Sequence, residues 1–172
     1  NFVAVHQFNF LERYDMLRLA APGATFQLDT PYPPNEVWNH LPRSVQETII
    51  EKNLHFYIID AVSVARETGM GRRINSIMQT CFFALMNLPS LPTDKAIEAI
   101  KAAIVKTYGK RGQAVIDQNF AAVDATLHNL HKVPLTPEVT SLWERQPVVP
   151  DFAPEFIRSV TARMIEGLGD EL

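Results

Sequence analysis

Short apolar runs separated by amphipathic stretches dominate the first half of the chain. Residues 54–59 read LHFYII and are apolar except for His55, which is typical of a strand covered on both faces. Residues 1–7 and 24–29 contain shorter runs of the same kind, and each is followed by a stretch with helical spacing. This alternation predicts an α/β fold, a three-layer domain whose mixed or parallel sheet is flanked by helices.

Helical periodicity accounts for most of the remaining residues. The clearest pattern begins at Ile74, because the apolar residues that follow it recur at spacings of three and four and form one helical face. Helices are predicted at residues 11–19, 36–40, 42–52, 62–67, 74–88, 93–109, 112–131 and 154–168. The C-terminal half is therefore expected to be rich in helices.

Composition divides the chain into three parts. Residues 1–133 carry the predicted strands and most of the helices, and they form the main domain. Residues 134–153 contain four prolines and are predicted to be a linker, interrupted by a short helix at 138–143. Residues 154–172 are expected to begin the following segment of a longer chain, because their apolar helix face has no evident partner in the preceding pattern.

Charge and cysteine content narrow the function classes. The 172 residues have a formal net charge of −3, which argues against a nucleic-acid binder that relies on phosphate neutralisation. A single cysteine cannot form an internal disulfide or supply a cysteine-rich iron–sulfur or zinc site. No apolar run reaches the roughly 18 to 20 residues that a membrane-spanning helix needs, so a cytoplasmic protein is expected.

One segment has the character of a ligand site. Gly69, Gly71, Arg72 and Arg73 combine two flexible backbone positions with two guanidinium groups just before a predicted helix, and Asn75 lies in its first turn. Backbone amides, a helix N-terminus and arginines together suit a phosphate or pyrophosphate group. The alternative is a helix C-cap followed by two arginines that are solvated or pair with another domain. No catalytic residue and no metal ligand is assigned.

The middle of the chain resembles a known enzyme family. The resemblance rests on FYIIDAVSVARETGMGRRINSIMQTCFFALMNLP and on AIEAIKAAIVKTYGKRGQAVIDQNFAAVDATLHNLHKV. Both are similar to the middle domain of pyruvate:ferredoxin (flavodoxin) oxidoreductases, which is equivalent to the separate gamma subunit of multi-subunit 2-oxoacid oxidoreductases. Residues 1–133 would then be a gamma-type domain that lacks its N-terminal part.

The resemblance implies an activity and a set of cofactors for the whole enzyme. Such enzymes decarboxylate pyruvate oxidatively on thiamine diphosphate with Mg²⁺, transfer the acetyl group to coenzyme A, and pass electrons through 4Fe–4S clusters to ferredoxin or flavodoxin. Other domains of the same enzyme, expected to be a homodimer, would hold these cofactors, and the isolated chain would be inactive. Gly69, Gly71, Arg72, Arg73 and Asn75 would face a cofactor such as coenzyme A or a neighbouring domain. The alternative is a stand-alone, non-catalytic α/β interaction or anion-binding domain.

Overall fold

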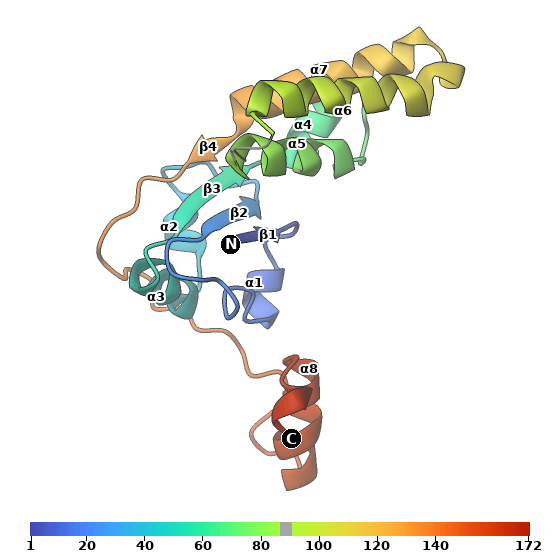
Figure 1. Ribbon diagram of the computed structural model, residues 1–172. Coiled ribbons are helices and arrows are strands. Elements are labelled where there is room, and N and C mark those ends of the chain that lie inside the picture. The colour runs from blue at the N-terminus through green and yellow to red at the C-terminus, as the bar shows by residue number, and fades with distance from the viewer. Residues whose placement is uncertain (87–90) are drawn as a thin grey trace.

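The computed structural model describes residues 1–86 and 91–172, and at its centre lies a four-stranded mixed sheet (Figure 1). The strands lie side by side in chain order: β1 (Phe2–Val5), β2 (Thr25–Asp29), β3 (His55–Ile59) and β4 (His131–Lys132). The first three are parallel, and β4 pairs antiparallel with β3. The predicted strands are confirmed, although no sequence pattern indicated the two-residue β4 that makes the sheet mixed.

Two groups of helices cover the two faces of this sheet (Figure 1). The described α-helices are α1 (Phe10–Arg13), α2 (Val37–His40), α3 (Arg43–Glu51), α4 (Ala61–Glu67), α5 (Asn75–Met86), α6 (Thr93–Tyr108), α7 (Gln113–Asn129) and α8 (Ala162–Ile165). Helices α1–α3 lie on one face and α4–α7 on the other, which gives the three layers predicted above. Helix α8 lies apart from the sheet near the C-terminus.

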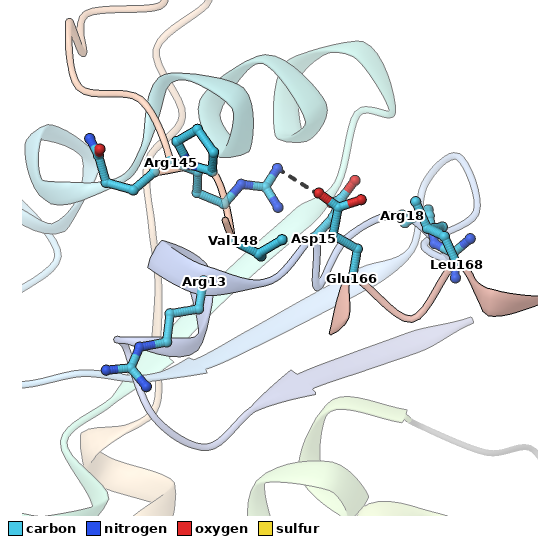
Figure 2. A pocket seen from close by; sticks show the side chains of 9 residues that line it. Arg13, Asp15, Arg18, Arg145, Val148, Glu166 and Leu168 are labelled. Atoms are coloured by element: carbon cyan, nitrogen blue, oxygen red, sulfur yellow. Dashed lines mark ion pairs between the residues drawn. The ribbon is translucent and has the colours of Figure 1, made fainter. Parts of the chain in front are cut away.

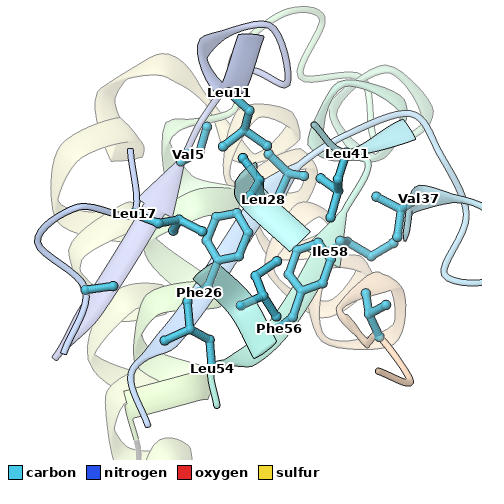
Figure 3. Packing of buried hydrophobic residues seen from close by; sticks show 14 of the residues in the cluster. Val5, Leu11, Leu17, Phe26, Leu28, Val37, Leu41, Leu54, Phe56 and Ile58 are labelled. Atoms are coloured by element: carbon cyan, nitrogen blue, oxygen red, sulfur yellow. The ribbon is translucent and has the colours of Figure 1, made fainter. Parts of the chain in front are cut away.

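The core between the sheet and α1–α3 is built from alternate strand residues (Figure 3). Phe26 and Leu28 of β2 and Phe56 and Ile58 of β3 project into it, because successive side chains of a strand point to opposite faces. The rings of Phe26 and Phe56 stack with their centroids 4.8 Å apart. Full burial of each such side chain contributes about 1.5–3 kcal/mol, so these strands are held mainly by this core.

A second core lies between the opposite face of the sheet and α4–α7. Ile59 of β3 joins Ile77 and Cys81 of α5 and Ala122 of α7 in this cluster. The small, fully buried Ala122 lets α7 approach its neighbours closely. Helices α6 and α7 also pack on each other through a third cluster, whose buried members are Ile100, Ile104, Ile116 and Val123.

The predicted helix at residues 11–19 is shorter than expected, because α1 ends at Arg13. Tyr14 turns to an extended conformation with φ −127° and ψ 149°. Beyond it, the ammonium group of Lys52 donates hydrogen bonds to the carbonyl oxygens of Leu17 and of the next residue, each at 3.0 Å. A distant side chain thus satisfies two carbonyl groups of the non-helical segment that follows α1.

The helix predicted at residues 138–143 does not form, and this prediction was wrong. Residues 140–145, here called the strap, run against α2 and α3 instead. The side-chain oxygen of Gln46 accepts hydrogen bonds from two strap N–H groups, and the Arg43 N–H donates to the Trp143 carbonyl oxygen at 2.7 Å. These tertiary hydrogen bonds hold the strap against α2 and α3 in a non-helical conformation.

The other helical predictions are confirmed with adjusted limits. Helices α6 and α7 begin and end within two residues of the predicted positions. Helix α5 covers most of the predicted 74–88, whose last two residues lie outside the described part of the chain. The C-terminal helix appears as a π-helical turn at Ile157–Thr161 that leads into α8. Among the described residues, no helix is long and apolar enough to cross a membrane.

Candidate functional site

A pocket of about 510 Å³ lies at the carboxyl ends of the three parallel strands. His6 follows β1, Asp29 ends β2 and Asp60 follows β3, so polar side chains from three neighbouring strands reach one pocket. Open α/β sheets bind ligands in crevices at this edge. We call it the strand-end pocket, and its lining residues are His6, Gln7, Phe8, Asp29, Thr30, Pro31, Asp60, Val62, Ser63, Arg72 and Ile74.

Asp29 connects the end of β2 to the start of α4. Its Oδ1 accepts a hydrogen bond from the Ala61 N–H at 2.9 Å, and the residue is only 7% exposed. Burial raises the pKa of this carboxyl, the hydrogen bond from Ala61 opposes the rise, and the nearby Asp60 carboxylate adds to it. His6 has the smallest effect on this pKa and lowers it. The lining of the pocket therefore includes a carboxyl group that releases its proton less readily than usual.

Asp60 is the N-cap residue of α4 and also lines the pocket. Its Oδ1 accepts a hydrogen bond from the Ser63 N–H at 2.9 Å, which is an N-cap interaction. Such a cap satisfies one of the free N–H groups at a helix start and stabilises the helix by about 0.5–2 kcal/mol. One oxygen of the second carboxylate of the pocket thus has a structural role, because it caps the start of α4.

Gly69 ends the same helix in a Schellman motif. The Gly69 N–H donates to the Arg66 carbonyl oxygen at 3.2 Å, and the Met70 N–H donates to the Ala65 carbonyl oxygen at 2.7 Å. Gly69 has φ +75°, a left-handed conformation that glycine adopts at low cost. Met70 is 3% exposed and anchors the turn in the second core. The C-cap alternative considered for this glycine therefore explains its conformation.

The remaining predicted site residues lie in different environments. Gly71 has φ +65° and leads into Arg72, which lines the strand-end pocket. The Arg73 Nε donates to the Met70 carbonyl oxygen at 3.2 Å. Asn75 lines a separate hollow of about 630 Å³ between β1 and α5. The structure thus brings Arg72 together with the strand ends, and does not bring all five predicted residues to one point.

Sequence reasoning missed the residues that meet Arg72 in the pocket. His6, Asp29, Asp60 and Ser63 belong to no short motif and are separated by up to 57 positions. The available signal was positional, because polar residues directly after consecutive parallel strands converge at one edge of the sheet. The predicted strands already placed three of these four residues there.

A second pocket, of about 350 Å³, lies where α1, the strap and the C-terminal residues meet (Figure 2). It is lined by Arg13, Arg18 and Arg145 among others. Arg145 Nη2 lies 3.7 Å from a carboxylate oxygen of Asp15, and Arg18 Nη1 lies 3.7 Å from one of Glu171. Because two of its three guanidinium groups are already paired, this pocket joins chain segments more than it offers free positive charge.

Metal-binding chemistry has little support in the described part of the chain. No three His, Cys, Asp or Glu side chains gather there closely enough to hold a metal ion. Cys81 is fully buried, and burial raises the pKa of its thiol from 9.0 to about 12, with a further contribution from the charge of Asp29. A thiol in this environment stays protonated and is a poor nucleophile or ligand.

These features define an α/β domain with a ligand-sized pocket at the strand ends. The chain belongs to the pyruvate ferredoxin/flavodoxin oxidoreductase family, whose family model matches residues 1–128. The family resemblance predicted from the sequence is thereby confirmed.

Three relatives illustrate the breadth of the family. A pyruvate-flavodoxin oxidoreductase of Rhodospirillum rubrum is 52% identical over 172 residues, which are all of this chain and 14% of that protein. A pyruvate:ferredoxin oxidoreductase of Moorella thermoacetica is 39% identical over the same coverage. A pyruvate dehydrogenase (NADP⁺) of Cryptosporidium parvum is 41% identical over 77% of this chain and 7% of its own length. The chain thus spans about a seventh of the first two relatives.

Proposed function

We propose that this chain is one segment of a larger enzyme that oxidatively decarboxylates pyruvate to acetyl-CoA and passes the electrons to ferredoxin or flavodoxin. The observation that carries the proposal is the match of the whole chain, from residue 1 to residue 172, to 14% of a relative named for this reaction. A segment of this size supplies structure, contacts to other domains and part of a binding surface. We expect it to have no turnover when isolated.

The choice of electron acceptor belongs to other parts of the enzyme. The three relatives described above are named for flavodoxin, ferredoxin and NADP⁺, yet each contains a segment that is 39% to 52% identical to this chain. All three names include pyruvate as the substrate. We therefore assign this segment to the function common to the three and not to acceptor specificity.

The residues present do not fit the redox and thiamine cofactors expected of such an enzyme. A 4Fe–4S cluster needs several cysteine thiolates, whereas Cys81 is the single cysteine and is buried with a raised pKa. Mg²⁺ is bound mainly through carboxylates and phosphates, and among the described residues no three His, Cys, Asp or Glu side chains gather closely enough to hold a metal ion. Thiamine diphosphate, Mg²⁺ and the clusters are therefore assigned to other domains.

Coenzyme A, the acetyl acceptor, fits the chain better. Its phosphate groups would be held by Arg72 at the rim of the strand-end pocket, next to the flexible backbone of Gly71. Asp29 and Asp60 would repel an anion deeper in the pocket, so they would face hydroxyl or amide groups of the ligand. Gly69, Arg73 and Asn75 would flank this contact. We propose Arg72 as the phosphate contact, and Gly69, Gly71, Arg73 and Asn75 as parts of the same cofactor-facing surface or of a contact with a neighbouring domain.

The partners and location follow from the same family relationship. The other domains of the same polypeptide are the first partners we propose, with a second subunit of the enzyme and the soluble electron carrier beyond them. We expect the whole enzyme to be a cytoplasmic homodimer.

The test starts from the size and activity of the protein that carries this sequence. An antibody against residues 54–88 is used on a lysate of the source cells, and the captured protein is assayed for reduction of a low-potential dye that requires both pyruvate and coenzyme A. We expect one band far larger than 19.4 kDa and activity in the captured fraction. A band at 19.4 kDa without activity would contradict the proposal and favour a stand-alone α/β interaction or anion-binding domain.

A further inference from the structure

A second cavity adjoins the strand-end pocket at the carboxyl edge of the sheet. It has a volume of about 210 Å³, and we call it the side chamber. Thr30, Pro31 and Asp60 line both cavities, so the two are neighbours that share these residues. Asn129 of α7 and His131 of β4 also line the side chamber, which therefore lies on the β4 side of the strand-end pocket.

The walls between the two cavities are held in place by aromatic and backbone contacts. Phe8 lines the strand-end pocket and packs edge-on against Tyr32 of the side chamber, with the ring centroids 5.2 Å apart. The Tyr32 ring also stacks on His40 at 3.7 Å. Thr30 Oγ1 accepts the Tyr32 N–H at 3.2 Å, and the Thr30 N–H donates to the Ile59 carbonyl oxygen at 2.9 Å. A chamber with such walls is formed before a ligand arrives, which reduces the entropic cost of binding.

The two cavities differ in charge. Arg72 lines the strand-end pocket, whereas no arginine or lysine is among the described residues that line the side chamber. The Asp60 carboxylate disfavours an anion in the side chamber. One of its oxygens accepts the Ser63 N–H, so the other can accept a hydrogen bond from a ligand. Asn129 donates its side-chain N–H to the Ala125 carbonyl oxygen, which leaves its Oδ1 as an acceptor. The side chamber thus suits an uncharged ligand group with N–H or O–H donors.

We propose that the side chamber binds the amide-bearing arm of coenzyme A while Arg72 holds the phosphate groups. The arm is uncharged and carries amide and hydroxyl donors, which match the acceptors of Asp60 and Asn129. Its methylene and methyl groups match the apolar wall of Tyr32 and Pro34. Coenzyme A therefore has an anionic half and a neutral half, as the two adjoining cavities require. This inference rests on the proposed function and adds a second binding cavity to it.

Equilibrium binding to the full-length enzyme tests the inference with two ligands. Coenzyme A carries both halves, whereas adenosine 3′,5′-bisphosphate carries phosphate groups without the arm. Asn129→Trp fills the side chamber, and Asn129→Leu removes only the amide group. The matched control, Gln113→Trp, places the same new side chain at an exposed position at the other end of α7. Isothermal titration calorimetry gives the Kd of each ligand for each variant.

We expect Asn129→Trp to raise the Kd for coenzyme A about tenfold and Asn129→Leu to raise it about threefold. The Kd for adenosine 3′,5′-bisphosphate should change less than about twofold in both variants, and Gln113→Trp should bind both ligands as the unmodified enzyme does. Unchanged coenzyme A binding by Asn129→Trp, or an equal loss for the two ligands, would overturn the inference. Failure of the proposed function would appear separately, as an unmodified enzyme that does not bind coenzyme A.

Discussion

The side-chain oxygen of Gln46 accepts a hydrogen bond from the Ser141 N–H at 2.9 Å, across 95 positions of the chain. The same oxygen accepts the Thr140 N–H at 2.9 Å, and the Gln46 amide nitrogen donates to the Trp38 carbonyl oxygen at 2.6 Å. Gln46 is fully buried, and Ser141 is 7% exposed. One amide group thus connects α2, α3 and the strap, which lies within the segment 134–153 that was predicted to be a linker.

Replacing Gln46 with Met should release the strap while keeping the volume of the side chain. The buried N–H of Ser141 would lose its acceptor, and an unsatisfied buried group costs about 1–3 kcal/mol. We expect the free energy of unfolding to fall by about that amount and hydrogen exchange at residues 140–143 to accelerate. Glu47→Met removes only an exposed ion pair with Arg43 and should change the free energy of unfolding by less than about 0.5 kcal/mol. Equal effects of the two substitutions would contradict the role of Gln46.

Replacing Gly69 with Ala should destabilise the domain because of its backbone conformation. A left-handed conformation costs a residue with a Cβ about 1–2 kcal/mol, and the new Cβ would lie 3.0 Å from Gln118 Nε2. We expect a loss of about 1–2 kcal/mol in urea unfolding. Gly109→Ala is the matched control, because Gly109 has φ −52° and its added Cβ meets no atom within 4 Å. That control should be neutral or stabilising by about 0.4–1 kcal/mol.

Local sequence patterns predicted the layers of this fold because the apolar pattern of each strand and long helix matches the element that it forms. The LHFYII run and the spacing after Ile74 each indicate one type of element whatever the tertiary context. The predictions were wrong where hydrogen bonds to residues distant in the sequence determine the local structure. A short helix was predicted at residues 138–143, but hydrogen bonds from Thr140 and Ser141 to Gln46 and from Arg43 to Trp143 hold this segment in a non-helical conformation. No local pattern contains that information.

In the candidate site, some residues could likewise be predicted from local sequence and others could not. Arg72 was found because glycines and arginines adjacent in sequence form a recognisable ligand-like motif, whereas His6, Asp29 and Asp60 meet it only through the parallel pairing of β1, β2 and β3. Gly69 was selected by the same motif, yet its conformation is accounted for by the end of α4. The short motif therefore predicted one residue of the pocket, Arg72, whereas the pairing of the strands determines which other residues line it.

The Asp29→Asn variant should change how stability depends on pH. The unfolded pKa of this carboxyl is near its ordinary value of 3.8, and burial raises the folded pKa. Between these two values the folded state binds more protons, so ionisation lowers the free energy of unfolding as pH rises. Asn keeps an acceptor for the Ala61 N–H and does not ionise. We expect its stability relative to wild type to increase from pH 3.8 upward and then level off above the folded pKa. Parallel pH profiles of urea unfolding would contradict this expectation.

Cys81 should resist alkylation until the domain unfolds. Raising the thiol pKa from 9.0 to about 12 lowers the thiolate fraction at pH 8 on the order of a thousandfold, and burial also excludes the reagent. We expect the Cys81 peptide to remain unmodified by iodoacetamide in the native protein and to react rapidly in urea. Mass spectrometry of that peptide distinguishes it from cysteines elsewhere in a longer chain. Rapid reaction of the native protein would show that the second core is more open than this packing allows.

Neutralising Arg72 should weaken coenzyme A binding more than neutralising Arg73. Arg72 lines the strand-end pocket, whereas Arg73 already donates its Nε hydrogen to the Met70 carbonyl oxygen. A charge-assisted hydrogen bond to phosphate contributes about 1.5–3 kcal/mol, so Arg72→Gln should raise the KM for coenzyme A about tenfold or more in the full-length enzyme. Arg73→Gln should raise it less than about threefold, and the KM for pyruvate should be unchanged in both variants. Added salt should narrow the difference between wild type and Arg72→Gln, because it screens the interaction between guanidinium and phosphate. Equal increases in the KM for coenzyme A would contradict the leading role of Arg72, and an unchanged KM in both variants would favour a contact of both arginines with a neighbouring domain.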